Sequence, residues 1–572
     1  MAATPPLSPS PTNEIGRIGR DLLCLVLLAL LLFGLRLGTA PLANPDEGRY
    51  AEIPREMLAT GDWVTPHLDG VNYFEKPPLF YWVTAASLQT FGQQEWAVRG
   101  VPALFALIGV LLTYSATRRL YGRSAGLAAG IVLATSLLYF ALARIVVLDM
   151  AVSVLMTAAL FCFILAVREP AGLRRRLLFY GVYASMALAT LTKGLMGFLI
   201  TGAIMFVWLL VFNQWRRLRP LCLPTGALLF LALAAPWHVL AARHNPTWVH
   251  RYFVFEHWER FTSPAAGRPG AWWYFIPVLL LGLFPWTGFL TSAVRESLRG
   301  GWAARKRNAE AWFLVVWAGL VFLFFSASHS KLVTYILPVF PPLAVLIGVR
   351  LASMWQGRKK QIETGLLVFT IFSVLLAVAV AVVVLRPGWL PDSVHLPPQV
   401  AELKPYAFAL AGIALAGGAL AHHLAQMYGL RSALSAVALT AILFYSTLTL
   451  IIGDVERPGT KELALTVKAR AQPGDRVVHF HEFFHDFTFY AERVVDVVSG
   501  KGELELEEDA AARAGDRFMD DAEFRRRWAG PVRLWVVASK KDPAVEELFK
   551  DPAFRYHLLG ESRGHYLFSN QP

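Results

Sequence analysis

Runs of about 20 apolar residues, each long enough to cross the hydrocarbon core of a bilayer, recur between Asp21 and Ile452. Short polar links separate these runs, so the backbone has to satisfy its hydrogen bonds inside helices. The composition agrees, because 55% of the residues are hydrophobic and 17% are charged, which is too apolar for a water-soluble chain of this length. The sequence therefore predicts a polytopic α-helical membrane protein.

Thirteen transmembrane spans are expected. They cover residues 21–40, 98–117, 124–141, 149–167, 177–192, 195–212, 221–242, 272–293, 311–327, 332–352, 362–385, 405–426 and 432–452. Only Lys193 and Gly194 separate the fifth span from the sixth, which makes this division the weakest. Cys24, Cys162 and Cys222 all lie within apolar runs, so neither a disulfide framework nor a thiolate metal site is indicated.

Basic residues cluster in the links between the predicted spans and account for much of the net charge of +13. The clusters are Arg118, Arg119 and Arg123; Arg174, Arg175 and Arg176; Arg216, Arg217 and Arg219; Arg305, Lys306 and Arg307; and Arg358, Lys359 and Lys360. With residues 1–20 in the cytoplasm, alternate counting puts every cluster on the cytoplasmic side. The charge thus indicates membrane orientation and not nucleic-acid binding.

The longer links then fall on the outer face, and they are residues 41–97, 243–271, 386–404 and 453–572. The first two contain amphipathic patterns typical of helices that lie along a membrane surface. After Gly453 the composition changes to short alternating apolar runs mixed with charged stretches, which predicts a small C-terminal α/β domain. Residues 21–452 form the membrane domain in this division.

Two acids stand directly after the first span, in "NPDEGRY". Asn44, Pro45 and an acid three residues after the cap are a usual helix start, and acids there are favoured by the helix dipole, so a purely structural role is one interpretation. Against it, Asp46 and Tyr50 share a helix face, with Glu47 and Arg49 beside them. We therefore treat these four residues as site candidates.

Other candidates follow on the same predicted face. "VNYFEKPPLFYW" contains Tyr73, Glu75 and Lys76, although Lys76 could simply be an interfacial lysine beside aromatic residues. Asp149 opens an apolar span, where a carboxylate is costly unless it faces protein or a cavity. Two later stretches add further polar side chains: Glu256, His257, Arg260, Lys331 and Tyr335. Two acids from different spans, surrounded by cations that suit phosphate, indicate one site.

An enzyme that transfers sugar on the outer face has no access to cytoplasmic nucleotide sugars. A polyprenyl-phosphate sugar fits the pattern, since its tail would lie between spans and cations would stabilise the charge developing on its phosphate. The acids would orient or activate the acceptor. This reaction needs no cofactor.

Six stretches carry a resemblance to a known family: "NPDEGRYAEIPREM", "GDWVTPHLDGVNYFEKPPLFYW", "RIVVLDMAV", "LTKG", "FEHWERF" and "KLVTYILP". They resemble the lipid A aminoarabinose transferases, which have the C-type glycosyltransferase fold and are related to the protein O-mannosyltransferases. The likeness covers most of the membrane region in the right order and is weaker after Gly453. It implies a bacterial inner-membrane enzyme with its active site and C-terminal domain in the periplasm.

The resemblance also implies roles for individual residues. Asp46 and Asp149 would be catalytic. Lys76, Arg260 and Tyr335 would hold the donor phosphate, and the cavity would be lined by Glu47, Arg49, Tyr50, Tyr73, Glu75, His257 and Lys331. The donor would be undecaprenyl-phosphate aminoarabinose and the acceptor a lipid A phosphate, with inversion at the anomeric carbon.

Alternatives remain open. A related enzyme could move another sugar or modify protein Ser or Thr, and the span count alone would allow a flippase or transporter, which would favour polar residues near mid-bilayer. "HEFFH", His481–His485, matches a zinc-binding helix motif, but its flanks favour strand or loop. Glu75, Glu256 and His257 could trap a cation that the chemistry does not require.

Overall fold

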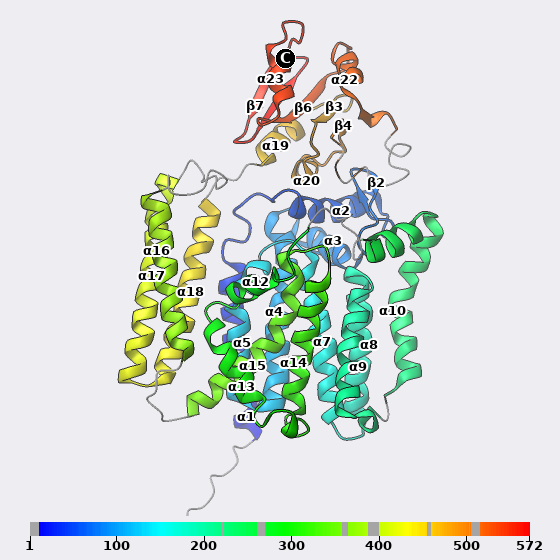
Figure 1. The fold of residues 1–572 in the computed structure, drawn as a ribbon. Coiled ribbons are helices and arrows are strands. Elements are labelled where there is room, and N and C mark those ends of the chain that lie inside the picture. Colours follow the sequence, from blue (N-terminus) through cyan, green and yellow to red (C-terminus); the bar gives the residue numbers. More distant parts are fainter. Residues whose placement is uncertain are drawn as a thin grey trace, which may run out of the picture.

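The structure is a computed structural model that describes residues 11–218, 221–259, 269–356, 364–386, 400–454, 459–500, 502, 504 and 515–572. A bundle of long helices carries a smaller α/β domain at one end (Figure 1). Between the two lie the short helices α2, Asp46–Thr60, and α3, Leu79–Phe91, with the hairpin strands β1, His67–Leu68, and β2, Val71–Asn72. We call this end of the bundle the α2 end.

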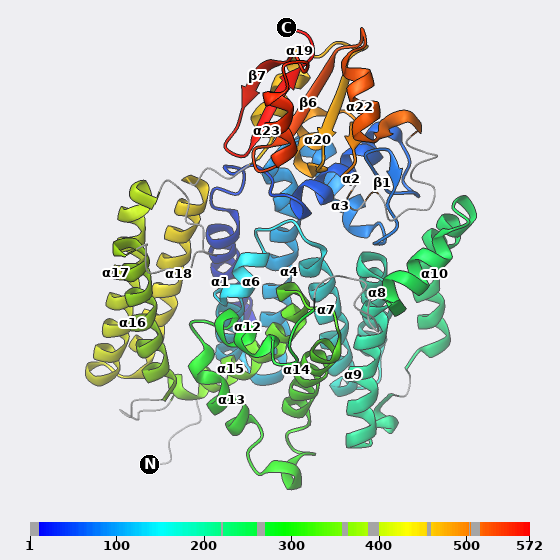
Figure 2. The same ribbon diagram turned by 45° about the horizontal axis from the view of Figure 1, so that its top comes forward.

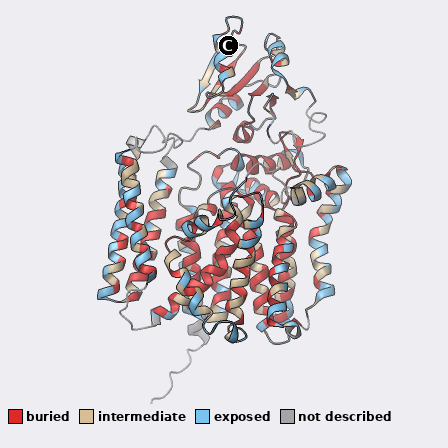
Figure 3. Ribbon diagram, viewed as in Figure 1, coloured by how far each residue is buried: buried red, intermediate tan, exposed pale blue. Residues whose placement is uncertain are grey.

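Within the described residues, eight helices are long and apolar enough to cross a membrane. They are α4, Glu95–Tyr121; α7, Leu148–Arg168; α10, Leu223–His244; α14, Ala309–Ala327; η7 with α15, Val333–Val339 and Phe340–Gln356; α16, Thr364–Leu385; α17, Val400–Met427; and α18, Leu430–Asp454. The expectation of a polytopic helical membrane protein is therefore confirmed. Helix α7 lies deep in the bundle, because 78% of the residues in its most apolar stretch are buried. Helices α10 and α16 lie at the rim, where only 22% of the corresponding residues are buried (Figure 3).

A further candidate span is bent. Helix α12, Phe275–Gly282, meets η5, Thr287–Phe289, and α13, Leu290–Ser297, at 106°. The sequence prediction of a continuous span over residues 272–293 is thus wrong. Pro285 lies in this break, and a proline interrupts a helix because it lacks an N–H and crowds the preceding turn.

Other helices lie in the same bundle but fall short of those criteria (Figures 1 and 2). They are α1, Pro11–Ala29, which continues as η1, Leu30–Gly34; α5, Arg123–Ala134; α6, Leu137–Leu142; α8, Leu173–Lys193; and α9, Met196–Phe212. The predicted span 124–141 is divided at Thr135 and Ser136, whose hydroxyls donate to backbone carbonyls four residues earlier. Such bonds compete with a regular helix.

The helix ends that carry arginines lie at the same end of the bundle. Arg118 and Arg119 lie in the last turn of α4, and Arg174 lies in the first turn of α8. Both helix ends lie away from the C-terminal domain (Figure 1). Short turns η2, Trp215–Leu218, and η6, Gly301–Ala304, lie at the same end. The predicted cluster Arg358, Lys359 and Lys360 and the link 386–404, apart from Arg386 and residues 400–404, lie outside the described residues.

The C-terminal domain is built on a six-stranded sheet in the order β5-β4-β3-β6-β8-β7. Its elements are α19, Lys461–Arg470; β3, Arg476–Phe480; α20, His485–Ala491; β4, Asp496–Val498; η10, Gly515–Arg517; β5, Phe518–Met519; α22, Asp521–Trp528; β6, Leu534–Ser539; α23, Pro543–Lys550; β7, His557–Glu561; and β8, His565–Ser569. The first four strands in the sheet order are parallel, while β8 and β7 run antiparallel to their neighbours. The predicted α/β domain is confirmed.

The "HEFFH" stretch of this domain does not form the helix that its zinc-binding interpretation needs. His481 lies in a loop with φ of 59°, and α20 begins only at His485. The His481 imidazole is bracketed by Asp521, at 2.7 Å, and Asp542, at 2.9 Å. No group of three or more metal-binding side chains is gathered anywhere in the described part of the chain.

Candidate functional site

A cavity of about 500 Å³ opens below α2, between α7, α8, α9 and α14. Its polar lining residues are Asp46, Arg49, Tyr50, Glu75, Lys76, Asp149, Lys193, Glu256, Ser328, Ser330, Thr334 and Tyr335. Its apolar lining residues are Val147, Leu148, Leu195, Met196, Leu199, Ile200, Phe253, Phe324, Phe325 and Leu332. The cavity thus joins charged groups to an apolar wall.

Helix α2 brings an acid, an arginine and a tyrosine to the cavity. Asp46 is its first residue, and its carboxylate accepts a hydrogen bond from Arg49 at 3.1 Å. Arg49 also donates to the Tyr73 hydroxyl at 3.2 Å. Burial raises the pKa of both Tyr50 and Tyr73 above the ordinary value, so both hydroxyls stay protonated at neutral pH. Tyr50 is therefore a neutral donor in the cavity lining.

The link between β2 and α3 contributes a second cation. Lys76 Nζ donates to Glu256 Oε2 at 3.0 Å and lies 3.7 Å from the Glu75 carboxylate. Glu256 lies on η3, His250–Glu259, so this contact joins two segments that are 180 residues apart. The side chains of Lys76 and Glu256 are 16% and 2% exposed. Such little exposure means that solvent screens this contact less than it screens a surface ion pair.

Asp149 lies in the first turn of α7 and pairs with Lys193, which ends α8. Both side chains are nearly buried, at 13% and 10% exposed. The Lys193 ammonium also lies 4.8 Å from the centre of the Tyr335 ring, within cation–π range. The cavity lining thus brings Asp46 and Asp149 together, and these are the two acids that the sequence singled out.

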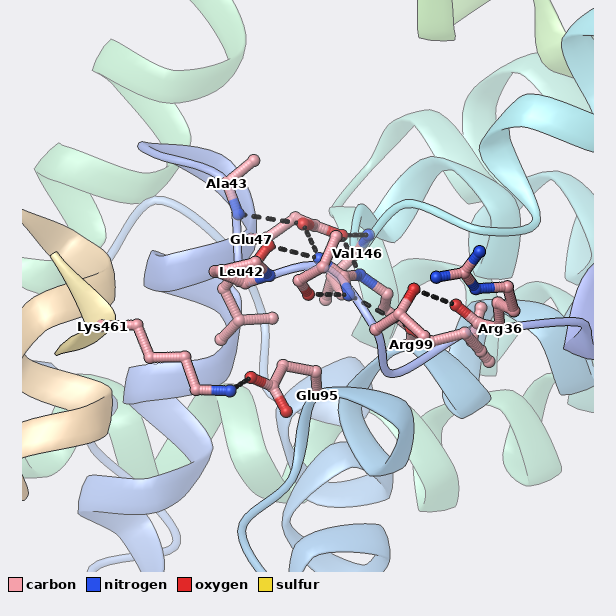
Figure 4. A network of polar contacts seen from close by, with 12 residues as sticks. Arg36, Leu42, Ala43, Glu47, Glu95, Arg99, Val146 and Lys461 are labelled. Atoms are coloured by element: carbon pink, nitrogen blue, oxygen red, sulfur yellow. Dashed lines mark hydrogen bonds and ion pairs between the residues drawn. The ribbon is translucent and has the colours of Figure 1, made fainter. Parts of the chain in front are cut away.

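The structure places Glu47 outside the cavity lining. Its buried carboxylate accepts bonds from Arg99 Nε and Nη2 at 2.9 and 2.6 Å (Figure 4). It also accepts bonds from the backbone N–H groups of Ala43 and Val146, at 3.0 and 3.2 Å. Arg99 donates onward to the carbonyls of Leu37, Ala40 and Pro41. Glu47 therefore holds α2 against α4 and, together with Arg99, fixes the link that precedes α2.

Glu47→Ala is expected to lower the melting temperature of the purified protein markedly, because removing one member of a buried, hydrogen-bonded ion pair costs about 3–5 kcal/mol. Glu47→Gln should lose less, since it keeps an acceptor oxygen and the side-chain shape. Thermal unfolding in detergent checks both variants. A Glu47→Ala protein as stable as the unchanged chain would contradict this role.

Two other candidates also lie outside the lining. Tyr73 is buried behind Arg49. The Lys331 ammonium donates to the carbonyls of Phe325, Ser326 and Ser328, at 3.2, 2.8 and 2.6 Å. A lysine in this position satisfies the free carbonyls at the end of α14. Its ammonium therefore points to that helix end and does not line the cavity.

Two predicted residues cannot be placed. Arg260 lies outside the described residues, and nothing is described of the His257 side chain. The cation site suggested by Glu75, Glu256 and His257 therefore includes a side chain outside the described part of the structure. Among the described acids of that set, Glu75 and Glu256 both face Lys76.

Sequence reasoning missed Lys193 as a site residue. Its signal was present, because a lysine between two apolar runs has to find a counter-ion or reach an interface. The sequence pattern alone places Lys193 only at the boundary between two predicted spans. Ser328, Ser330 and Thr334 gave no such signal, since hydroxyl residues are common at span ends.

The fold and the cavity define a polytopic membrane protein with acids, amines and an apolar wall gathered at the α2 end. Residues 75–239 match the family model of dolichyl-phosphate-mannose-protein mannosyltransferase. The chain is 32% identical to an undecaprenyl phosphate-alpha-4-amino-4-deoxy-L-arabinose arabinosyl transferase of Proteus mirabilis, over 66% of this chain and 68% of that relative. This chain belongs to the family of these arabinosyl transferases.

Two further likenesses agree. The relative of the same name from Aeromonas salmonicida is 35% identical over 64% of this chain and 66% of its own length, so the match spans just under two thirds of that relative. The crystal structure of ArnT from Cupriavidus metallidurans bound to undecaprenyl phosphate superimposes with a TM-score of 0.84 at 29% identity, covering 96% of this chain and 98% of that one. The likeness in structure thus includes the C-terminal domain.

Proposed function

We propose that this protein transfers 4-amino-4-deoxy-L-arabinose from undecaprenyl phosphate to lipid A phosphate groups at the periplasmic face of a bacterial inner membrane. The observation that carries the proposal is the cavity, where acids and amines meet an apolar wall. The names of the relatives supply the sugar and its carrier. A family model for a lipid-phosphate-linked mannosyltransferase supports the same kind of donor.

The donor phosphate is the leaving group. In the proposed reaction an oxygen of the lipid A phosphate attacks the anomeric carbon, the bond from that carbon to the donor phosphate breaks, and undecaprenyl phosphate departs with the electron pair. Lys76 and Tyr335, with Arg260, would stabilise the charge that develops on that phosphate. Attack opposite the leaving group gives inversion. The chain's own residues supply each role, so the proposal includes no cofactor.

In this reaction Asp46 and Asp149 would not act as general bases. A lipid A phosphate is already largely ionised at neutral pH and needs little deprotonation, unlike a Ser or Thr hydroxyl. The two acids would therefore position groups and stabilise the positive character of the sugar at the transition state. Arg49, 3.1 Å from the Asp46 carboxylate, would offset repulsion between that acid and the incoming phosphate.

We also propose thirteen spans with the N-terminus in the cytoplasm and the α2 end in the periplasm. The helices α1, α5, α8 and α9 and the bent pair α12–α13 lie among the eight longer ones (Figure 2). Basic helix ends at the opposite end support that orientation by the positive-inside rule. The boundaries would be 1–20 for the cytoplasmic segment, 21–452 for the membrane domain and 453–572 for the periplasmic domain.

Mass spectrometry of lipid A from a deletion strain, with and without the intact gene, tests the function. Aminoarabinose should be attached to lipid A only in the strain that carries the intact gene. Because the amine masks negative phosphate charge, complemented cells should also bind polymyxin and other cationic peptides less and survive higher concentrations. An unchanged aminoarabinose content would reject the substrate assignment.

Measurements of lipid A, of periplasmic proteins and of lipid movement in the same two strains separate the alternatives. A different sugar on lipid A, or glycosylated periplasmic proteins, would point to a related transferase with another substrate. Movement of lipid without a new glycosidic bond would point to a flippase. The charged groups of the cavity gather below α2 and not at mid-bundle, which favours an interfacial enzyme.

A further inference from the structure

The C-terminal domain rests directly on the helix that carries Asp46. A Cβ added to Gly48 of α2 would lie 2.5 Å from the backbone nitrogen of Asp486 and 2.6 Å from the carbonyl carbon of His485. Both of these atoms belong to the first turn of α20. Backbone atoms cannot move aside as a flexible side chain can, so only glycine permits this approach. The domain sits over α2 and α3 (Figure 2).

A reciprocal polar contact fixes the residues just before α2. The Asn44 side chain donates to the Asp486 carboxylate and accepts from the Asp486 backbone N–H at 2.9 Å. The second carboxylate oxygen of Asp486 accepts from the backbone N–H of Thr460 at 3.0 Å. Asn44 is thus engaged by the C-terminal domain and makes no side-chain cap on α2, although the sequence predicted that it would.

A second contact lies at the other end of α20. The Tyr490 hydroxyl accepts from the backbone N–H of Leu42 at 2.9 Å and donates to Glu95 at 3.0 Å. Glu95 also pairs with Lys461 of α19 (Figure 4). The domain therefore holds the chain on both sides of Ala43, while the Glu47 carboxylate holds it from within the membrane domain.

We propose that the C-terminal domain positions Asp46 through the Asn44–Asp486 contact. Asp46 follows Asn44 by two residues, and its own side chain is 52% exposed. Its place at the cavity therefore depends on the bond from Arg49 and on its backbone, which α20 holds through Asn44 and Gly48. Asn44 and Asp486 are positioning residues, and their catalytic consequence rests on the proposed function.

An exchange of the two residues tests this contact. Asn44→Asp alone sets two carboxylates against each other. Asp486→Asn alone leaves one oxygen for two donors, the Asn44 amide and the Thr460 N–H. The double variant restores every bond: Asn at 486 donates to Asp at 44 and accepts from Thr460, and Asp at 44 accepts from the backbone N–H of residue 486. If the single variants lost activity only because the fold was destabilised, the second substitution would not restore it.

Each single variant should lower kcat on the order of 10-fold, since small displacements of reacting groups are costly, with KM for the lipid-linked donor unchanged. The double variant should regain most of the activity. Hydrogen exchange of the backbone over residues 42–50 should be faster in both single variants and normal in the double variant. Full activity in the single variants, or no repair in the double variant, would overturn the proposal.

Arg517→Ala is the matched control. Arg517 of the C-terminal domain pairs with Asp69 of the β1–β2 hairpin at 3.0 Å, away from the start of α2. Its loss should leave kcat and exchange over residues 42–50 near normal. An equal loss of kcat would mean that weakening any contact of the C-terminal domain lowers activity. It would therefore refute a specific role for the Asn44–Asp486 contact. If the unchanged chain transfers no sugar, the proposed function fails, and hydrogen exchange still decides whether α20 holds the segment.

Discussion

Asp46→Asn is expected to reduce sugar transfer by at least about 100-fold, the usual cost of removing a charge that stabilises a transition state. Asparagine keeps the shape and one acceptor oxygen for Arg49, so the fold should not change. The rate of transfer from a lipid-linked donor to lipid A, measured with purified protein in liposomes, checks the loss. Thermal unfolding checks that the variant is folded.

Asp62→Asn is the control for that variant. Asp62 lies in the same link and its Oδ1 accepts from the backbone N–H groups of Val64 and Thr65. Asparagine keeps that oxygen, so transfer should continue at a normal rate. A folded Asp46→Asn enzyme with normal transfer would show that this carboxylate has no catalytic part.

Lys193→Met should both inactivate and destabilise the protein. It leaves the nearly buried Asp149 without its cation, and breaking such a pair by removing one partner costs about 3–5 kcal/mol. An unpaired carboxylate would also repel the donor phosphate. We expect a lower melting temperature and transfer at least about 100-fold slower.

The double variant Asp149→Asn with Lys193→Met separates these two effects. Without the buried charge, it should regain most of the stability lost by Lys193→Met. It should stay inactive, because the carboxylate to which we assign a catalytic role is gone. Recovery of transfer in this double variant would contradict a catalytic role for Asp149, and unchanged stability of Lys193→Met would contradict the pairing.

Much of the membrane fold was predictable because lipid leaves the chain few options. A span must satisfy its own backbone bonds, so runs such as 149–167 appear as helices with nearly the expected ends, here α7. The failures occurred where a residue interrupts a run locally. Pro285 lies in the bend between α12 and α13, and Thr135 and Ser136 lie between α5 and α6.

The site was predictable in part for a similar reason. Asp46 and Asp149 stood out because carboxylates next to apolar runs need a partner or a cavity. Their partners depend on packing between distant segments. Local spacing predicts that Asn44 caps a helix, but its side-chain amide donates to Asp486, 442 residues away. A single sequence contains no signal for a contact of that kind.

A structure of this protein with undecaprenyl phosphate bound would test the central claim most directly. We expect the phosphate to lie in the cavity below α2, in contact with Lys76 and Tyr335, with the tail along Leu195, Met196 and Leu199. Asp46 and Asp149 should both face the position of the missing sugar. A phosphate bound elsewhere, with neither acid near it, would contradict the account.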